Sequence, residues 1–172
     1  MAIDFKGLIA EVPDFPKPGV SFKDLTPILS SPAAYAESVS RIADWYTGQG
    51  ITAVVAAEAR GFLWAGPLGQ ALRAAVVPVR KPKKLPRPTI SSSYQLEYGT
   101  DTLHMHRDAL KPGERVLIFD DVLATGGTAK AMIDLVTQLK AEVVSLAFIV
   151  ELTYLHGRAK LAPHDVRALA AY

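Results

Sequence analysis

Cysteine is missing from the 172-residue sequence, which excludes a disulfide framework and thiolate chemistry. Long apolar runs are missing too: no stretch approaches the roughly eighteen residues of a membrane-spanning helix, and the opening residues 1–6 lack the apolar segment of a secretion signal. A surplus of one charge sign is nearly absent, since the formal net charge is +2. We therefore expect a cytoplasmic protein that binds neither a membrane nor nucleic acid.

The composition is typical of a globular protein, with 49% hydrophobic and 21% charged residues. The length predicts a single domain over residues 1–172 with one core. Positive charge is nevertheless concentrated in one proline-interrupted segment, which contains Arg80, Lys81, Lys83, Lys84 and Arg87. This segment is either a solvated connector or an anion-binding loop.

Short runs rich in β-branched residues alternate with helical stretches, which predicts an α/β fold with a mostly parallel sheet. Apolar residues at three- and four-residue spacing indicate helices, the first with Ser31 as N-cap, Pro32 in its first turn and an end before Gly48. Residues 93–109 interrupt the alternation and predict a β-hairpin around residues 99–101. The predicted strands are residues 51–58, 75–80, 115–122 and 143–152, and two further helices begin near residues 62 and 128.

Polar residues follow three of the predicted strands. They are Glu58–Gly61, Arg80–Lys81 and the pair Asp120–Asp121. In open parallel sheets, ligands bind beyond the carboxyl ends of the strands. We therefore expect the three clusters to share one crevice.

The segment Thr125–Thr128, TGGT, lies between a predicted strand and a predicted helix. Its two glycines allow the backbone to approach an anion closely, and the free amides of a helix N-terminus favour a phosphate. The alternative is an ordinary strand-to-helix turn with Thr128 as N-cap. The segment is neither a Walker loop nor a GxGxxG dinucleotide loop.

Two adjacent carboxylates, Asp120 and Asp121, precede this turn although carboxylates repel phosphate. They could be an exposed pair at the rim of the sheet, or ligands of Mg²⁺. A third interpretation is that they accept hydrogen bonds from the vicinal hydroxyls of a sugar. A sugar phosphate would satisfy both groups, with ribose on the acids and the 5′-phosphate on the amides of the turn.

The stretch VLIFDDVLATGGT, residues 116–128, resembles the phosphoribosyl-diphosphate motif of type I phosphoribosyltransferases, and Ala124 resembles the form found in members that use adenine. Five more segments resemble the same family in the same order along nearly the whole chain: DFPKPGVSFKDLTPIL, EARGF, RKPKKLP, YQLEYG and VELTYLHGRAKLAP. The resemblance implies a Rossmann-like sheet flanked by helices. It also implies a small hood formed by residues 1–30 and a lid formed by the basic loop and hairpin at residues 81–106.

The reaction implied by this resemblance transfers the phosphoribosyl group of phosphoribosyl diphosphate to N9 of adenine, giving AMP and diphosphate. By the same resemblance, Arg60, Arg80 and Lys84 contact the diphosphate, and Asp120 and Asp121 lie at the ribose. Mg²⁺ would be held mainly by diphosphate, ribose and water rather than by protein ligands. The 5′-phosphate would be bound by Ala124, Thr125, Gly126, Gly127 and Thr128. A homodimer is also implied.

The resemblance places adenine against the hood. Phe22 would stack on the base, with backbone groups of Ser21 and Lys23 at its Watson-Crick edge. Glu97 would transfer a proton at the base and Tyr98 would cover the reacting groups, so that these two and Arg60 are the expected catalytic residues. Without the resemblance, Phe22 would be expected in the core and Glu97 on an exposed strand.

Three residues depart from the family pattern. Lys23 stands where many members have Arg, Ala59 where Ser is frequent, and Lys83 where Gly is frequent. His104 and His106 share a strand face but have no third metal ligand in sequence reach, so a solvated face is expected there.

Two alternative functions remain at this point. The chain could be a regulator of the same fold that senses a nucleotide or phosphoribosyl diphosphate without turning it over. It could be a transferase for another purine. A receiver domain is disfavoured, because its acidic pair would come early in the chain.

Overall fold

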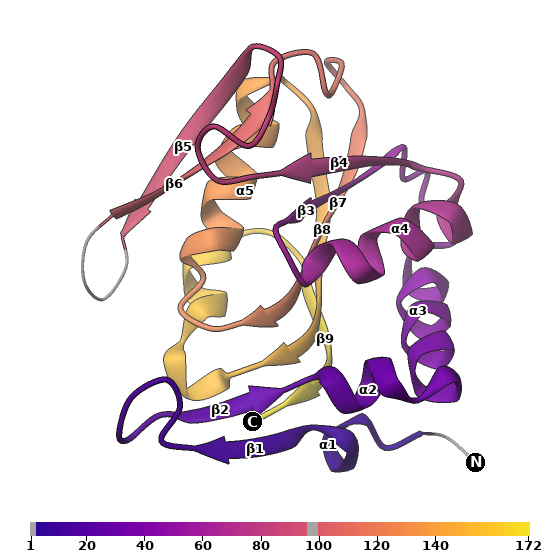
Figure 1. The fold of residues 1–172 in the computed structure, drawn as a ribbon. Coiled ribbons are helices and arrows are strands. Elements are labelled where there is room, and N and C mark those ends of the chain that lie inside the picture. Colours follow the sequence, from indigo (N-terminus) through magenta and orange to yellow (C-terminus); the bar gives the residue numbers. More distant parts are fainter. Residues whose placement is uncertain (1–2, 96–99) are drawn as a thin grey trace.

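A five-stranded parallel sheet forms the centre of the protein, in the order β4-β3-β7-β8-β9 (Figure 1). The computed structural model describes residues 3–95 and 100–172. The strands of this sheet are β3 (Ala53–Ala57), β4 (Ala75–Val79), β7 (Arg115–Leu123), β8 (Glu142–Glu151) and β9 (Val166–Ala171). The predicted α/β fold with a mostly parallel sheet is therefore confirmed.

Three helices flank the sheet, and all three were predicted: α3 (Pro32–Tyr46), α4 (Gly61–Leu72) and α5 (Gly127–Gln138). The Ser31 side chain accepts a hydrogen bond from the backbone N–H of Ala34, so it caps α3 as expected. Strand β9 was not predicted. Three of its six residues are alanine, a residue depleted in strands, and its burial does not alternate.

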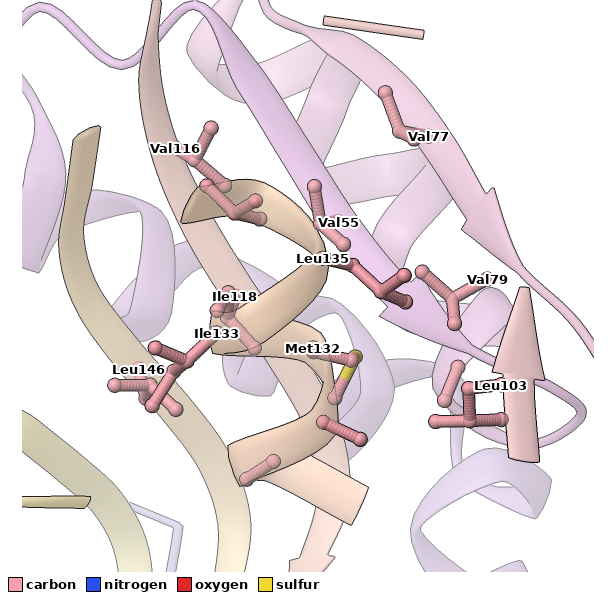
Figure 2. Close-up of a cluster of buried hydrophobic side chains, with 14 of the residues drawn as sticks. Val55, Val77, Val79, Leu103, Val116, Ile118, Met132, Ile133, Leu135 and Leu146 are labelled. Atoms are coloured by element: carbon pink, nitrogen blue, oxygen red, sulfur yellow. The ribbon is translucent and has the colours of Figure 1, made fainter. Parts of the chain in front are cut away.

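The sheet has a buried cluster on each face, and successive residues of β3 point to opposite clusters. Val55 packs toward α5, where Met132, Ile133 and Leu135 lie over the sheet (Figure 2). Val54 joins the second cluster, which contains Trp64 of α4. The helices α4 and α5 therefore cover opposite faces.

This arrangement creates a switch point between β3 and β7. From β3 the chain crosses through α4 to β4 on one side, whereas from β7 it crosses through α5 to β8 on the other. Ligands of open α/β sheets bind in the crevice where neighbouring connections diverge in this way. The carboxyl ends of β3 and β7 carry the Glu58–Gly61 and Asp120–Asp121 clusters.

The opening segment is more regular than the sequence indicated. It forms α1 (Phe5–Leu8), β1 (Ala10–Pro13), β2 (Ser21–Asp24) and α2 (Thr26–Ser30), with β1 and β2 paired antiparallel. The prolines of this segment predict an irregular opening through Pro27, and that prediction was wrong. All four residues of β1 are exposed and all four of β2 are half-buried, so burial alternates along neither strand. Such alternation is the pattern by which a half-buried strand is recognised from sequence.

The predicted hairpin is present as β5 (Thr89–Gln95) and β6 (Thr100–His106). Thr100 and Asp101 belong to β6, so the strand begins where the sequence placed the turn. The hairpin lies against α5, where the Gln138 side-chain amide donates to the carbonyl of Ser91. A backbone pair between Arg80 and His104 joins it to the end of β4.

Two short 3-10 helices, η1 (Thr153–Leu155) and η2 (Gly157–Leu161), connect β8 to β9. They lie beyond the same end of the sheet as the switch point, since the N–H of Leu152 bonds the carbonyl of Leu123 at the end of β7. No helix in residues 3–95 and 100–172 has the length and apolar character to cross a membrane.

Candidate active site

A cavity of about 690 Å³ lies at the carboxyl ends of β3, β7 and β8. Its walls come from the hood, the residues after β3, the end of β7 with its turn, the residues after β8, and also the basic loop and the hairpin, which contribute Lys81, Tyr94 and Leu103. Predicted residues on the sugar-phosphate side of the lining are Arg60, Asp120, Asp121, Ala124, Thr125 and Thr128. Those on the hood side are Ser21, Phe22 and Lys23. Gly126 and Gly127 line a smaller adjoining hollow together with Thr125 and Thr128.

The turn after β7 has the geometry of an anion site. Gly126 is the N-cap of α5, with φ of 80° and no side-chain cap, and Gly127 is the first helical residue. The alternative in which Thr128 caps the helix is therefore wrong. An N-terminus without a side-chain cap leaves its first amides available to an anion, and the helix dipole adds to the attraction.

Gly157 supports this turn from behind. A Cβ atom on Gly126 would lie 2.6 Å from the Gly157 carbonyl oxygen, and one on Gly157 would lie 2.2 Å from the Ala124 carbonyl oxygen. Two backbones thus touch where no side chain fits. Arg158 fixes the supporting segment, because its Nε donates to Glu151 at 2.9 Å and its Nη1 donates to the Val166 carbonyl at 2.6 Å.

The acidic pair is buried or half-buried rather than exposed at the rim of the sheet. The Asp121 side chain is 7% exposed and pairs with the Arg60 guanidinium. Asp120 accepts a hydrogen bond from the Asp121 backbone N–H at 2.9 Å. Burial, and then the charge of Asp121, raise the pKa of Asp120 well above its usual value. The exposed-rim interpretation of Asp121 is therefore wrong.

A second ion pair joins Arg80 to Glu58, which lines the cavity. Burial raises the pKa of Glu58, but the hydrogen bond from Arg80 and the charges of Arg80 and Lys81 outweigh it, and the net pKa is below its usual value. Arg60 and Arg80 are thus each paired with a carboxylate of the cavity lining, but of the two arginines only Arg60 lines the described cavity.

The lysine of the basic loop that lines the cavity is not the one that the sequence predicted. Lys84 is exposed and is not part of the described cavity lining, whereas Lys81 is. Lys83 has φ of 65°, the left-handed region that favours glycine. The loop thus retains a glycine-like path at the position where the family often has Gly.

On the hood side, Phe22 is half-buried and lines the cavity. Phe15 packs edge-on against it with ring centroids 5.1 Å apart, and the Arg60 guanidinium lies 5.9 Å from its ring centroid. The expectation of an ordinary core phenylalanine therefore does not hold. An aromatic ring in the same cavity as the acidic pair is suited to a flat, uncharged group.

The Lys23 ammonium lies in a cluster with Glu11, Ser21 and Tyr172. It lies 2.9 Å from a Glu11 carboxylate oxygen and 3.2 Å from the Ser21 hydroxyl. The same ammonium lies 4.5 Å from the centroid of the Tyr172 ring. Only 8% of this side chain is exposed, and its ammonium charge is paired with a carboxylate of the hood itself.

Several lining residues were missed at the sequence level. Tyr94 comes from β5, and Leu152, Tyr154 and Leu155 follow β8. The rule that ligands lie beyond strand ends applies to β8 as well as to β3 and β7, and it would have found the last three.

Some predicted residues lie elsewhere. Glu97 and Tyr98 fall outside the described residues. His104 and His106 are half-buried rather than solvated, with Thr89 and Arg87 hydrogen-bonded to their respective Nδ1 atoms. The His106 Nε2 is buried and has no partner among the described atoms.

The chain matches the family model described as "Phosphoribosyl transferase domain" over residues 26–168. It is 52% identical to an adenine phosphoribosyltransferase of Pelobacter propionicus over 169 residues, covering 98% of each chain. A crystal structure of adenine phosphoribosyltransferase from Thermoanaerobacter pseudethanolicus superposes with a TM-score of 0.94 at 48% identity and 98% coverage of both chains. A Saccharomyces cerevisiae adenine phosphoribosyltransferase, complexed with an imino-altritol bisphosphate and adenine, superposes with a TM-score of 0.91 at 35% identity and 96% coverage of both chains.

Proposed function

The chain belongs to the phosphoribosyltransferase family and, within it, to the adenine phosphoribosyltransferases of purine salvage, and on that premise we propose how its cavity makes AMP. The reaction joins N9 of adenine to C1′ of phosphoribosyl diphosphate and releases diphosphate. The observation that supports the proposal best is one cavity with three linings: an uncapped helix N-terminus, an enclosed acidic pair and an aromatic face. These suit a phosphate, a sugar and a flat base, in that order.

We place the 5′-phosphate on the turn formed by residues 124–128, where backbone amides and the hydroxyls of Thr125 and Thr128 donate to it. The ribose hydroxyls then donate to Asp120 and Asp121. Because sugar and phosphate are covalently joined, the acidic pair and the turn must be close together, and only Val122 and Leu123 separate them in the chain.

The two arginines exchange partners when substrate binds. Arg60 leaves Asp121, and Arg80 leaves Glu58, for the more highly charged diphosphate. Asp121 is thereby free to accept from the ribose. In the transition state, negative charge on the departing diphosphate faces the arginines, and positive charge on the ring faces the carboxylates.

Magnesium fits this site as a partner of the substrate. Mg²⁺ prefers oxygen ligands, retains several waters and often binds through one or two carboxylates with substrate phosphates. The described residues include no group of three side chains able to hold a metal, whereas Asp120 and Asp121 offer carboxylate oxygens to its water ligands. When bound, Mg²⁺ would neutralise charge on the diphosphate.

Adenine lies against Phe22, with its Watson-Crick edge at the backbone of β2. This strand pairs with β1 alone, so every second residue has N–H and C=O groups that point away from the hairpin. Ser21 and Lys23 are two apart, so their backbone groups point the same way, and we place the base on that side. Since the Lys23 ammonium is held by Glu11, its backbone is the part left for the base, and replacing the family's Arg leaves that contact intact.

Glu97 and Tyr98 complete the proposal from the sequence. Glu97 transfers a proton at adenine N7 and Tyr98 covers the reacting groups. Residues 1–30 act as the hood and residues 81–106 as a lid that excludes water from the reacting ribose. We also propose a homodimer, which light scattering tests directly.

The deciding experiment is a steady-state assay with adenine, hypoxanthine, guanine and xanthine, each with phosphoribosyl diphosphate, in the presence and absence of Mg²⁺. AMP from adenine, dependent on Mg²⁺, is the expected result. Binding of phosphoribosyl diphosphate without any nucleotide product would identify a sensor instead. A preferred base other than adenine would overturn the assignment of the hood.

A further inference from the structure

We propose that Tyr172 is a positioning residue of the base end of the cavity, because it joins two separate parts of the cavity lining. One part is β2, with Phe22 and Lys23, and the other is the connection after β8, with Leu152 and Tyr154. This inference rests on the proposed function, since it takes the base to lie against Phe22. It adds that the position of this strand is set from the central sheet.

The backbone of Tyr172 is fixed to the connection after β8. Its N–H donates to the Glu151 carbonyl at 2.9 Å, and its backbone oxygen accepts from the Thr153 N–H at 2.8 Å. These two bonds flank Leu152, whose own N–H donates to the Leu123 carbonyl at the end of β7 at 2.9 Å. The Tyr172 backbone therefore moves only with the central sheet and with this part of the lining.

The side chain of Tyr172 reaches the hood. Its hydroxyl donates to the Lys6 carbonyl of α1 at 3.0 Å, and its ring centroid lies 4.6 Å from the Lys6 ammonium. The Lys23 ammonium of β2 lies 4.5 Å from the same centroid. Cation–π attraction is stronger where the cation is desolvated, and the Lys23 side chain is only 8% exposed. One half-buried ring thus contacts both α1 and β2.

These contacts bear on the base because β2 has little other support. Among the described strands, β2 pairs with β1 alone, so no ladder joins it to the central sheet. The contact between Lys23 and Tyr172 supplies that connection, one residue from Phe22. Without the ring, β2 would still pair with β1, but its position relative to Leu152 would be less fixed. The phosphate turn would be unaffected, because buried residues of β7 and α5 hold it.

The test compares two ligands that differ by the base. Tyr172→Leu removes the ring and the hydroxyl, and calorimetry should show a Kd for AMP about three- to tenfold higher, as for the loss of one or two polar contacts. The Kd for ribose 5-phosphate should stay unchanged. Tyr172→Phe keeps the ring beside both lysines, so its Kd for AMP should lie between those of the unaltered protein and Tyr172→Leu.

The matched control is Tyr35→Leu. Tyr35 is also half-buried, its hydroxyl also donates to a backbone carbonyl of another element, that of Leu63, and it is not part of the described cavity lining. This variant should change neither Kd. If Tyr172→Leu does not fold, the smaller rise expected for Tyr172→Phe, confined to AMP, decides the question.

A double-mutant cycle tests whether the ring acts through β2. In a Lys23→Met background, Tyr172→Leu should raise the Kd for AMP by a smaller factor than it does alone. An unchanged Kd for AMP, an equal loss for ribose 5-phosphate, or an undiminished effect in the Lys23→Met background would each overturn the inference. If AMP binds the unaltered protein no more tightly than ribose 5-phosphate, the proposed placement of the base fails as well.

Discussion

The phosphate turn and the hood line the same cavity, but the turn is carried by the central sheet and the hood strand by a two-stranded sheet at the periphery (Figure 1). Residues 116–119 of β7 are fully buried, as are Ala131, Met132 and Leu135 of α5. In contrast, β1 is exposed along its length and β2 is half-buried. Close packing fixes the first region, because shifting it would open voids in the core.

Polar contacts join the strands of the second region to the end of β9, whereas its helices add Phe5 and Ile28 to the buried cluster. Glu11, Lys23 and Tyr172 meet between the hood and the end of β9, and Lys6 lies 4.6 Å from the centroid of the same Tyr172 ring. Surface contacts of this kind contribute little individually. The comparison indicates that the sugar-phosphate end of the cavity is fixed by core packing, whereas the strands at the base end have fewer buried contacts.

The largest effect is expected from a substitution that alters proton transfer and leaves the phosphate turn and the hood unchanged. Glu97→Gln should lower turnover by about 10²–10⁴, the usual contribution of a general acid or base. The KM values for adenine and phosphoribosyl diphosphate should stay close to normal in steady-state kinetics. Unchanged turnover would remove Glu97 from the mechanism.

Gly157→Ala should damage the preformed region. The added Cβ would lie 2.2 Å from the Ala124 carbonyl oxygen, so the turn must move. Overpacking of this kind costs about 1–3 kcal/mol, and the KM for phosphoribosyl diphosphate should rise roughly 10- to 100-fold if that strain falls on the turn. Gly66→Ala is the control, because a Cβ at Gly66 meets nothing within 4 Å. A loss confined to adenine would contradict the rigid-turn interpretation.

Phe22→Leu should weaken the base end. A base-aromatic stack contributes about 1–3 kcal/mol, of which leucine keeps a part, so the KM for adenine should rise roughly tenfold. The KM for phosphoribosyl diphosphate should be unaffected. Phe15→Leu alters the edge-on partner instead and should have a smaller effect. Equal effects on both substrates would mean that the two regions are not independent.

The smallest effect concerns pH and the hood alone. Hydrogen bonds from Ser21 and then Lys23 lower the pKa of Glu11 below its usual 4.5. Its stabilising contribution is therefore complete above 4.5 and is lost as pH falls through the lower folded value. Hydrogen exchange, corrected for intrinsic rates, should show loss of protection in β2 upon acidification before any loss in β7. Glu11→Gln should weaken protection of β2 already at neutral pH.

The sequence predicted the regions where one physical signal dominates. Continuous apolar runs revealed β3, β7 and β8, and the carboxylates and glycines at their ends located the sugar-phosphate half of the cavity. The strands of the hood are only four residues long and contain no such buried run, so the sequence did not reveal them. The role of Gly157 was not predicted, because this residue acts through a contact with the backbone of Gly126. Gly126 and Gly157 are 31 residues apart, and no local sequence pattern records such a contact. Tyr94 and Tyr154 look like ordinary strand or loop aromatics until the fold brings them to the cavity.

Gly126 and Gly157 meet backbone to backbone, so neither position can be varied alone. Among related sequences, the two glycines should be retained together or lost together, with a rearranged β8–β9 connection wherever they are lost. Anyone redesigning the turn for a larger anion would have to rebuild both stretches of chain at once.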